Sequence, residues 1–123
     1  MQTIIHSQGF SVTDPIRAHL SRRLSLAIGQ FDRNITKVNV FLKDINGSGK
    51  GGEDKKVLVE IHMRAQAPLV VEETSNDLYM AISIAARKAR RAINRTMRRL
   101  RRFDRGEPLH LRLTGPAGVA DSN

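Results

Sequence analysis

Residues 35–43, ITKVNVFLK, follow an alternating pattern. Val38, Val40 and Leu42 fall on one side of it, and Lys37, Asn39, Phe41 and Lys43 fall on the other. A period of two with β-branched residues predicts a half-buried β-strand. Residues 56–64 repeat the pattern with Val57, Val59, Ile61 and Met63. The glycine-rich residues 44–54 predict a flexible loop, so the two stretches together predict a β-hairpin.

Two more strands are predicted outward from this hairpin. Residues 2–8 hold the apolar pair Ile4 and Ile5 ahead of Gly9, and residues 68–73 follow a turn at residues 65–67. Proline has no amide hydrogen to donate, so Pro68 suits the beginning of a strand or a sheet edge. We expect both segments to join the hairpin in one sheet.

A helix is predicted between the first two strands. Thr13 can cap its start, and Asp14 and Pro15 suit its first turn. Apolar side chains then recur every three or four residues, at Ile16, Leu20, Leu24, Ala27, Ile28 and Phe31. This spacing gives the helix one apolar face, and we expect the helix to fray near Gly29.

A longer helix is predicted after the last strand. Thr74 and Asp77 match a capping box, in which the Asp77 side chain reaches back to the Thr74 amide. At about 100° per residue, one set of apolar side chains falls within roughly 100° of arc. This set is Leu78, Ile82, Ala85, Ala89, Ile93, Met97 and Leu100. The stripe predicts a helix that packs one face against the sheet.

The element order β-α-β-β-β-α predicts an α+β fold, a two-layer sandwich in which a four-stranded sheet carries two helices on one face. This layout is like that of a double-stranded-RNA-binding domain. The first two strands should run parallel in a right-handed crossover. We assign residues 1–103 to one domain and residues 104–123 to a flexible C-terminal tail. Residues 109–113 of the tail alternate like a short strand.

The net charge is concentrated in one segment. The chain has 21 Lys and Arg against 12 Asp and Glu, which gives +9. Residues 86–103 hold nine basic residues and no acid, so the remainder of the chain is balanced. On a helical wheel these nine cover the half-turn opposite the apolar stripe. We call them the basic face: Arg87, Lys88, Arg90, Arg91, Arg95, Arg98, Arg99, Arg101 and Arg102.

The plain alternative for the basic face is a solvated helix surface. Such surfaces usually mix charges, because like charges four residues apart destabilise a helix by about 0.2–0.5 kcal/mol. Pairs such as Arg87–Arg91 and Arg91–Arg95 accept this cost with no acidic counterweight expected nearby. Eight of the nine residues are arginine, whose planar guanidinium can hold a phosphate with two hydrogen bonds. The basic face therefore predicts an anionic partner.

The kind of anion can be narrowed from the rest of the sequence. A membrane surface is disfavoured because the apolar side of this helix is mostly Ala and Ile and is needed for the core. Five aromatic residues in the chain give little support for base stacking. Structured RNA, read by phosphate contacts and shape, is the preferred partner, and an acidic protein remains open.

Catalytic and metal-binding signatures are not found. His6, His19, His62 and His110 are scattered without the spacing of a metal site, and the chain has no cysteine. The loop NGSGKGG misses the phosphate-loop pattern at two positions. We predict no catalytic residue, metal, cofactor or small-molecule substrate, so the protein should not be an enzyme. The start does not resemble a signal peptide and no apolar run could span a membrane, so we expect a cytoplasmic protein.

Three strings of this sequence resemble a known family in their order and spacing. They are QGFSVTDPIRAHLSRRL at residues 8–24, FDRNITKVNVFLK at 31–43 and VEETSNDLYMAISIAARKARRAI at 71–93. The chain resembles the short form of the family of ribosome hibernation promoting factors and ribosome-associated inhibitor A (protein Y), also known as sigma-54 modulation proteins. The resemblance covers residues 1 to about 103.

The resemblance implies a function. Members bind the small ribosomal subunit over the channel for messenger and transfer RNA, block translation in stationary phase as part of a stress response and preserve idle ribosomes. It implies that the matching basic positions contact ribosomal RNA: Arg22, Arg23, Lys43, Arg87, Lys88, Arg90, Arg91, Arg95, Arg98 and Arg99. Arg102 extends this RNA-binding set along the basic face.

Some points stay open. The tail is too short for the dimerisation domain of long-form members, so we expect a monomer off the ribosome. Whether the protein promotes ribosome dimers or keeps single ribosomes idle is not decided. The alternative function is a free-standing double-stranded RNA-binding protein. The last helix of such domains starts with lysines, whereas here it starts at the acidic Asp77.

Overall fold

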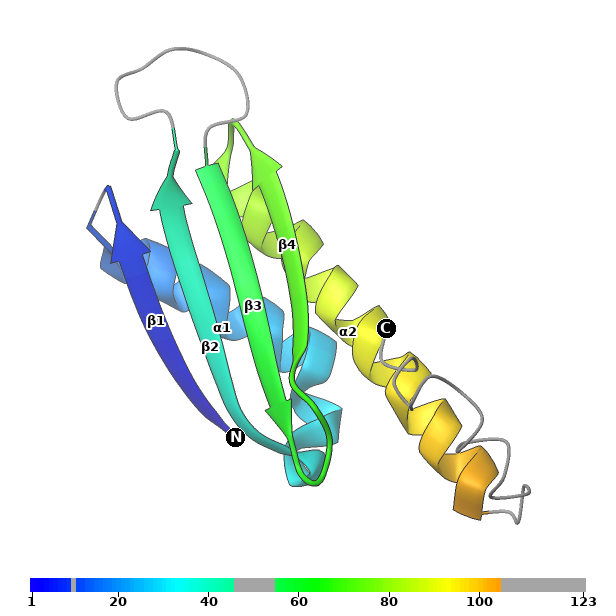
Figure 1. The fold of residues 1–123 in the computed structure, drawn as a ribbon. Helices are drawn as coiled ribbons and strands as arrows, with labels where there is room; N and C mark the ends of the chain where they lie inside the picture. The colour runs from blue at the N-terminus through cyan, green and yellow to red at the C-terminus, as the bar shows by residue number, and fades with distance from the viewer. Residues whose placement is uncertain (10, 46–54, 105–123) are drawn as a thin grey trace.

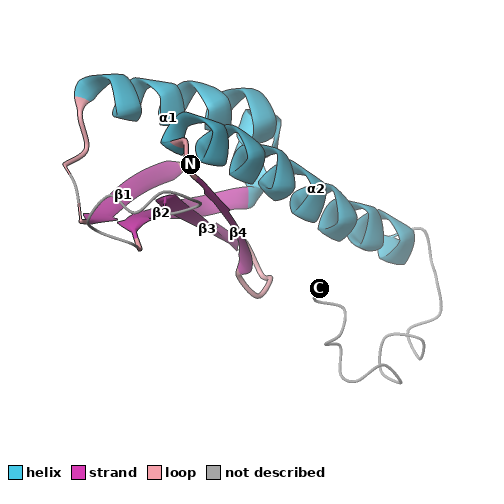
Figure 2. Ribbon diagram, turned by 90° about the horizontal axis from the view of Figure 1, so that it is seen from above, coloured by secondary structure: helices cyan, strands magenta, loops and turns pink. Residues whose placement is uncertain are grey.

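A computed structural model describes residues 1–9, 11–45 and 55–104, with side chains to residue 102. The chain forms a four-stranded mixed sheet with two long helices (Figure 1). The elements are β1 (Gln2–Gln8), α1 (Asp14–Ile28), the 3₁₀ helix η1 (Gly29–Asn34), β2 (Ile35–Asp44), β3 (Lys55–Met63), β4 (Leu69–Ser75) and α2 (Leu78–Asp104). Both helices cover the same face of the sheet (Figure 2). The predicted α+β sandwich is therefore confirmed.

The strands lie in the sheet in the order of the chain, β1-β2-β3-β4. β1 runs parallel to β2, and the other neighbours are antiparallel, as the sequence predicted. The register shifts between Ile35 and Lys37, so a bulge lies at the start of β2. The extra residue lets both Ile35 and Val38 face the core, although strict alternation would put them on opposite faces.

The core lies between the sheet and the helices. Its strand residues include the seven predicted from the alternation, which are all buried: Val38, Val40, Leu42, Val57, Val59, Ile61 and Met63. Ile35, which the alternation did not include, is buried beside them. From α1 and η1 come Leu20, Leu24, Ile28 and Phe31. The buried stripe of α2 is wider than predicted, because the small side chains of Ala81, Ala86, Ala92 and Thr96 are buried beside Ile82, Ala85, Ala89 and Ile93. Small residues let α2 lie close against the sheet.

The helix starts differ in how well they were predicted. Thr13 caps α1 as expected, since its hydroxyl accepts a hydrogen bond from the Ile16 amide at 3.4 Å. The capping box at Thr74 is wrong, because Thr74 and Ser75 still belong to β4. Instead Asp77 caps α2, and its carboxylate accepts from the Tyr79 amide at 3.0 Å. The strand continues because Thr74 pairs with Lys56 in the sheet.

The predicted ends of the other elements are close to those observed. α1 ends at Ile28, and the chain continues as η1, which keeps Phe31 in the core.

The helices are joined by His19, whose Nε2 lies 3.2 Å from the Tyr79 carbonyl oxygen and 3.3 Å from the Ser83 hydroxyl. The predicted loop at 44–54 and the predicted tail lie largely outside the described residues, and the domain boundary at residue 103 stays a prediction.

Candidate nucleic-acid interface

The helix α2 presents most of the basic face to solvent. It has 27 residues, which corresponds to a length of about 40 Å at 1.5 Å per residue. Its last turns project beyond the strands (Figures 1 and 2). Seven basic side chains along it are exposed: Arg87, Arg90, Arg91, Arg95, Arg98, Arg101 and Arg102. The structure therefore brings these predicted residues together on one helix surface.

Lys88 differs from the other predicted RNA-binding residues of α2. It is half-buried, and its Nζ lies 2.6 Å from Oε1 of Glu73 on β4. The same ammonium donates to the Glu72 carbonyl oxygen at 2.9 Å. The expectation that the basic face lacks an acidic counterweight is thus wrong at this position. Lys88 holds α2 to β4, an edge strand of the sheet.

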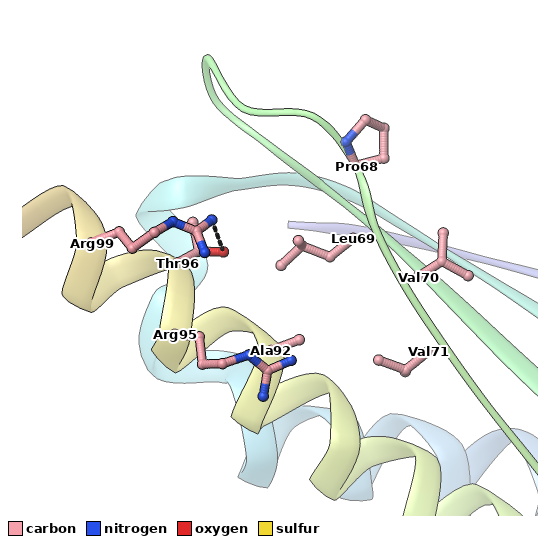
Figure 3. Close-up of a pocket in the computed structure, with 8 residues that line it drawn as sticks. All are labelled: Pro68, Leu69, Val70, Val71, Ala92, Arg95, Thr96 and Arg99. Carbon is pink, nitrogen blue, oxygen red and sulfur yellow. Dashed lines mark hydrogen bonds between the residues drawn. The ribbon is translucent and has the colours of Figure 1, made fainter. Parts of the chain in front are cut away.

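Arg95 and Arg99 line a groove between α2 and β4 (Figure 3). The groove has a volume of about 240 Å³, and its lining consists of Pro68, Leu69, Val70, Val71, Ala92, Arg95, Thr96 and Arg99. Arg99 is half-buried and its Nη2 donates to the buried Thr96 hydroxyl at 3.5 Å. The groove therefore combines an apolar floor with two guanidinium groups.

The remaining predicted residues lie on two different sides of the molecule. Arg22 is exposed and Arg23 half-buried on α1, which lies on the same face of the sheet as α2 (Figure 2). Lys43 is exposed near the end of β2, one residue after the buried Leu42. Side chains alternate along a strand, so Lys43 belongs to the sheet face that carries no helix. It is not part of the helix-side cluster.

That second face, the open face, holds a chain of polar contacts that the sequence did not reveal. Asn39 donates to Oε1 of Glu60 at 3.0 Å, and His62 Nε2 lies 3.1 Å from the same oxygen. The hydrogen bond from Asn39 and the nearby His62 hold the pKa of Glu60 below its ordinary value. Asn39 and Glu60 are directly opposite each other in the β2–β3 pair, so only the strand register could have indicated the contact.

Among the described residues, no group of three or more His, Asp and Glu side chains is placed to hold a metal ion. The helices within that same part of the chain include none with the length and apolar character to cross a membrane.

Solved structures with the same fold are known. A ribosomal subunit interface protein from Coxiella burnetii superposes with a TM-score of 0.67 at 14% identity, covering 79% of this chain and 98% of that one. The N-terminal domain of Thermus thermophilus Protein Y gives a TM-score of 0.60 at 21% identity, covering 78% of this chain and 99% of that one. The fold is therefore that of ribosomal subunit interface proteins.

The sequence itself fixes the family. Residues 3–101 match the family model described as Sigma 54 modulation protein / S30EA ribosomal protein. This chain belongs to that family, which is one of ribosome-associated factors, and the resemblance predicted from the three strings is confirmed. No curated protein sequence matches the chain.

Proposed function

We propose that this protein binds the small ribosomal subunit through the basic face of α2, inhibits translation and preserves idle ribosomes in stationary phase. It acts in the cytoplasm as a non-enzymatic, monomeric factor that contacts ribosomal RNA. Membership in a family of ribosome-associated factors supports the ribosome as the partner. The chemistry of α2 supports RNA as the surface that is contacted.

A set of unengaged guanidinium groups carries the proposal. Within the described part of the chain, no hydrogen bond or ion pair holds the side chains of Arg87, Arg90, Arg91, Arg95, Arg98 and Arg101. Their like charges repel one another, which makes the free protein less stable. RNA phosphates would remove this repulsion and accept bidentate hydrogen bonds from the same groups.

The spacing of these residues suits a nucleic-acid backbone. Arg87, Arg91, Arg95 and Arg98 follow one another every three or four residues. They form a row about 16 Å long, at 1.5 Å of rise per residue. Such a row contacts several phosphates in succession without reading bases, which fits recognition of folded RNA by its shape.

Sedimentation with purified ribosomal particles tests the proposal. The protein should pellet with small subunits and should bind large subunits or a naked RNA duplex more weakly. Arg91→Glu should reduce pelleting, whereas Arg33→Glu makes the same charge change at an exposed residue outside α2 and should not. Added protein should also lower the yield of a cell-free translation reaction. Tighter binding to the duplex than to small subunits would contradict the proposal and favour a free-standing double-stranded RNA-binding protein.

A further inference from the structure

The open face carries an exposed pair of aromatic rings. His6 on β1 and Phe41 on β2 are partners in the parallel strand pair. Their ring centroids lie 4.5 Å apart with an interplanar angle of 10°, so the rings are stacked. Phe41 is 38% exposed. Leu58 on β3 is the other register partner of Phe41, so His6, Phe41 and Leu58 form a row across the sheet.

A hollow lies beside this row. Its volume is about 270 Å³, and its lining consists of His6, Ser7, Gln8, Phe41, Leu42, Lys43, Lys56 and Leu58. Gln8, Lys43 and Lys56 are themselves register partners and form a second row parallel to the first. Rows two residues apart on a strand are separated by about 6.6 Å. Ligand pockets usually exceed about 300 Å³, so this hollow suits one planar ring rather than a whole cofactor.

The charge around the hollow is positive. Lys43 is exposed and has no hydrogen bond or ion pair within the described part of the chain. The Nζ of Lys56 lies 3.2 Å from Oε1 of Glu72, a carboxylate that is 55% exposed. Glu60 on β3 is also an acid of this face, and its carboxylate already contacts Asn39 and His62. The hollow thus offers an apolar wall on one side and ammonium groups on the other.

We propose that this hollow binds one base of a single-stranded RNA segment, with the base against His6, Phe41 and Leu58 and its phosphate at Lys43. Lys56 can exchange Glu72 for the same phosphate. A nucleotide in a single strand has both parts that the hollow recognises, a planar ring and an attached anion, and aromatic side chains bind such bases with little sequence preference. A duplex cannot use the site, because its bases are paired and stacked inside.

This site is separate from the basic face. α2 covers one face of the sheet (Figure 2). The lining of the hollow comes only from the strands and includes Phe41, Lys43 and Lys56 of the open face. The proposal therefore goes beyond ribosomal binding by α2 and does not depend on it. Two RNA segments could be held at once, one through its folded backbone and one through an unpaired base.

Binding of a fluorescent uridine decamer at low salt tests the proposal. Phe41→Ala should weaken binding about tenfold, and Phe41→Tyr should retain it, because stacking of one base contributes about 5- to 150-fold in affinity. Met80→Ala is the matched control, since it removes an exposed apolar side chain outside the hollow. Thermal melts should show that each variant is folded. An unchanged affinity of Phe41→Ala overturns the proposal.

Nuclear magnetic resonance provides the second readout, and it keeps the test independent of the basic face. The decamer should shift the ring resonances of His6 and Phe41 in the protein with Arg91→Glu as well as in the natural one. Shifts confined to α2 overturn the proposal. A titration with uridine monophosphate tests whether the hollow binds RNA or a free nucleotide. If the monophosphate saturates these shifts as tightly as the decamer does, the site takes a free nucleotide and the RNA assignment is wrong.

Discussion

The ammonium of Lys88 lies 2.6 Å from the carboxylate of Glu73 and joins α2 to the edge strand β4. The preceding residue, Arg87, is exposed and has no such partner in the described part of the chain. Two adjacent cations on one helix thus have different surroundings. One contributes to the packing of the helix on the sheet, and the other is available to an external anion.

This difference can be measured with two single substitutions. Lys88→Ala should lower the free energy of unfolding by about 0.2–1 kcal/mol, the range for ion pairs that remain accessible to solvent, and should leave ribosome binding nearly unchanged. Arg87→Ala should weaken ribosome binding and leave the free energy of unfolding nearly unchanged. Denaturant titrations and ribosome pelleting of both variants check this. A strong binding defect in Lys88→Ala that is not shared by Arg87→Ala would contradict the assignment.

Binding to ribosomes should depend steeply on salt. If residues 87–102 make about six phosphate contacts, the slope of log affinity against log salt should be about −4 to −5. The slope reflects the counterions released when arginines replace them on the RNA. Affinities measured between low and moderate salt decide this, and an affinity that hardly changes excludes the basic face as the main contact.

The residues of α2 that serve ribosome binding can be separated by substitution from those that serve stability. Arg91 and Arg95 are exposed, whereas Ile82 and Ile93 are at most 1% exposed. Replacing both arginines by Glu should weaken ribosome binding and leave the melting temperature nearly unchanged. Ile82→Ala or Ile93→Ala should instead cost about 2–4 kcal/mol of stability, because each leaves a cavity in the core. Unfolding of the double Glu variant in a thermal melt would show that these arginines serve the fold.

Acid should remove the stabilisation provided by Glu60. Its pKa in the folded protein is lowered, first by the Asn39 hydrogen bond and then by His62. A carboxylate with a lowered folded pKa contributes stability above its unfolded pKa and loses that contribution as the pH falls through the folded pKa. We therefore expect the melting temperature to fall in acid below the ordinary Glu pKa of 4.5. In Glu60→Gln the melting temperature should fall less as the pH is lowered. An unchanged fall would argue against the contact of Glu60 with Asn39 and His62.

The segment after α2 is predicted to be dispensable for the domain. Deletion of residues 105–123 should leave a folded, largely monomeric protein that still binds ribosomes, because the core cluster of the described part is built from side chains between residues 20 and 93. Size-exclusion chromatography with light scattering and ribosome pelleting check the three properties. Loss of a dimer that the full chain forms would show that the tail serves assembly.

The sequence was most informative where one local pattern decides the structure. Alternation predicted the inward residues of β2 and β3, since a strand has only two faces. It could not predict the bulge between Ile35 and Lys37, which depends on pairing with β3. The Thr74–Asp77 spacing was misleading because sheet pairing extends β4 through Ser75 and leaves the cap to Asp77 alone.

The candidate site was predictable as a charge pattern but not as a set of contacts. The exposure of Arg91 and Arg95 follows from the helical wheel, which needs only the sequence of α2. The pairing of Lys88 with Glu73 depends on how α2 lies over β4. Lys43 was grouped with the helical cations although the sheet separates it from them. The stacking of His6 on Phe41 joins residues 35 positions apart, through a register that local patterns do not contain.

Because α2 projects beyond the sheet, the helicity of its last turns should depend on the anions around it. Thr96 is the last buried residue of the helix in the part whose side chains are described, so the turns after it gain little from tertiary packing. Repulsion between Arg98 and Arg101 opposes helix formation there, and bound polyanions relieve it. Helicity at this end should therefore rise when polyphosphate is added, and part of the affinity for RNA is then spent on ordering the surface that binds it.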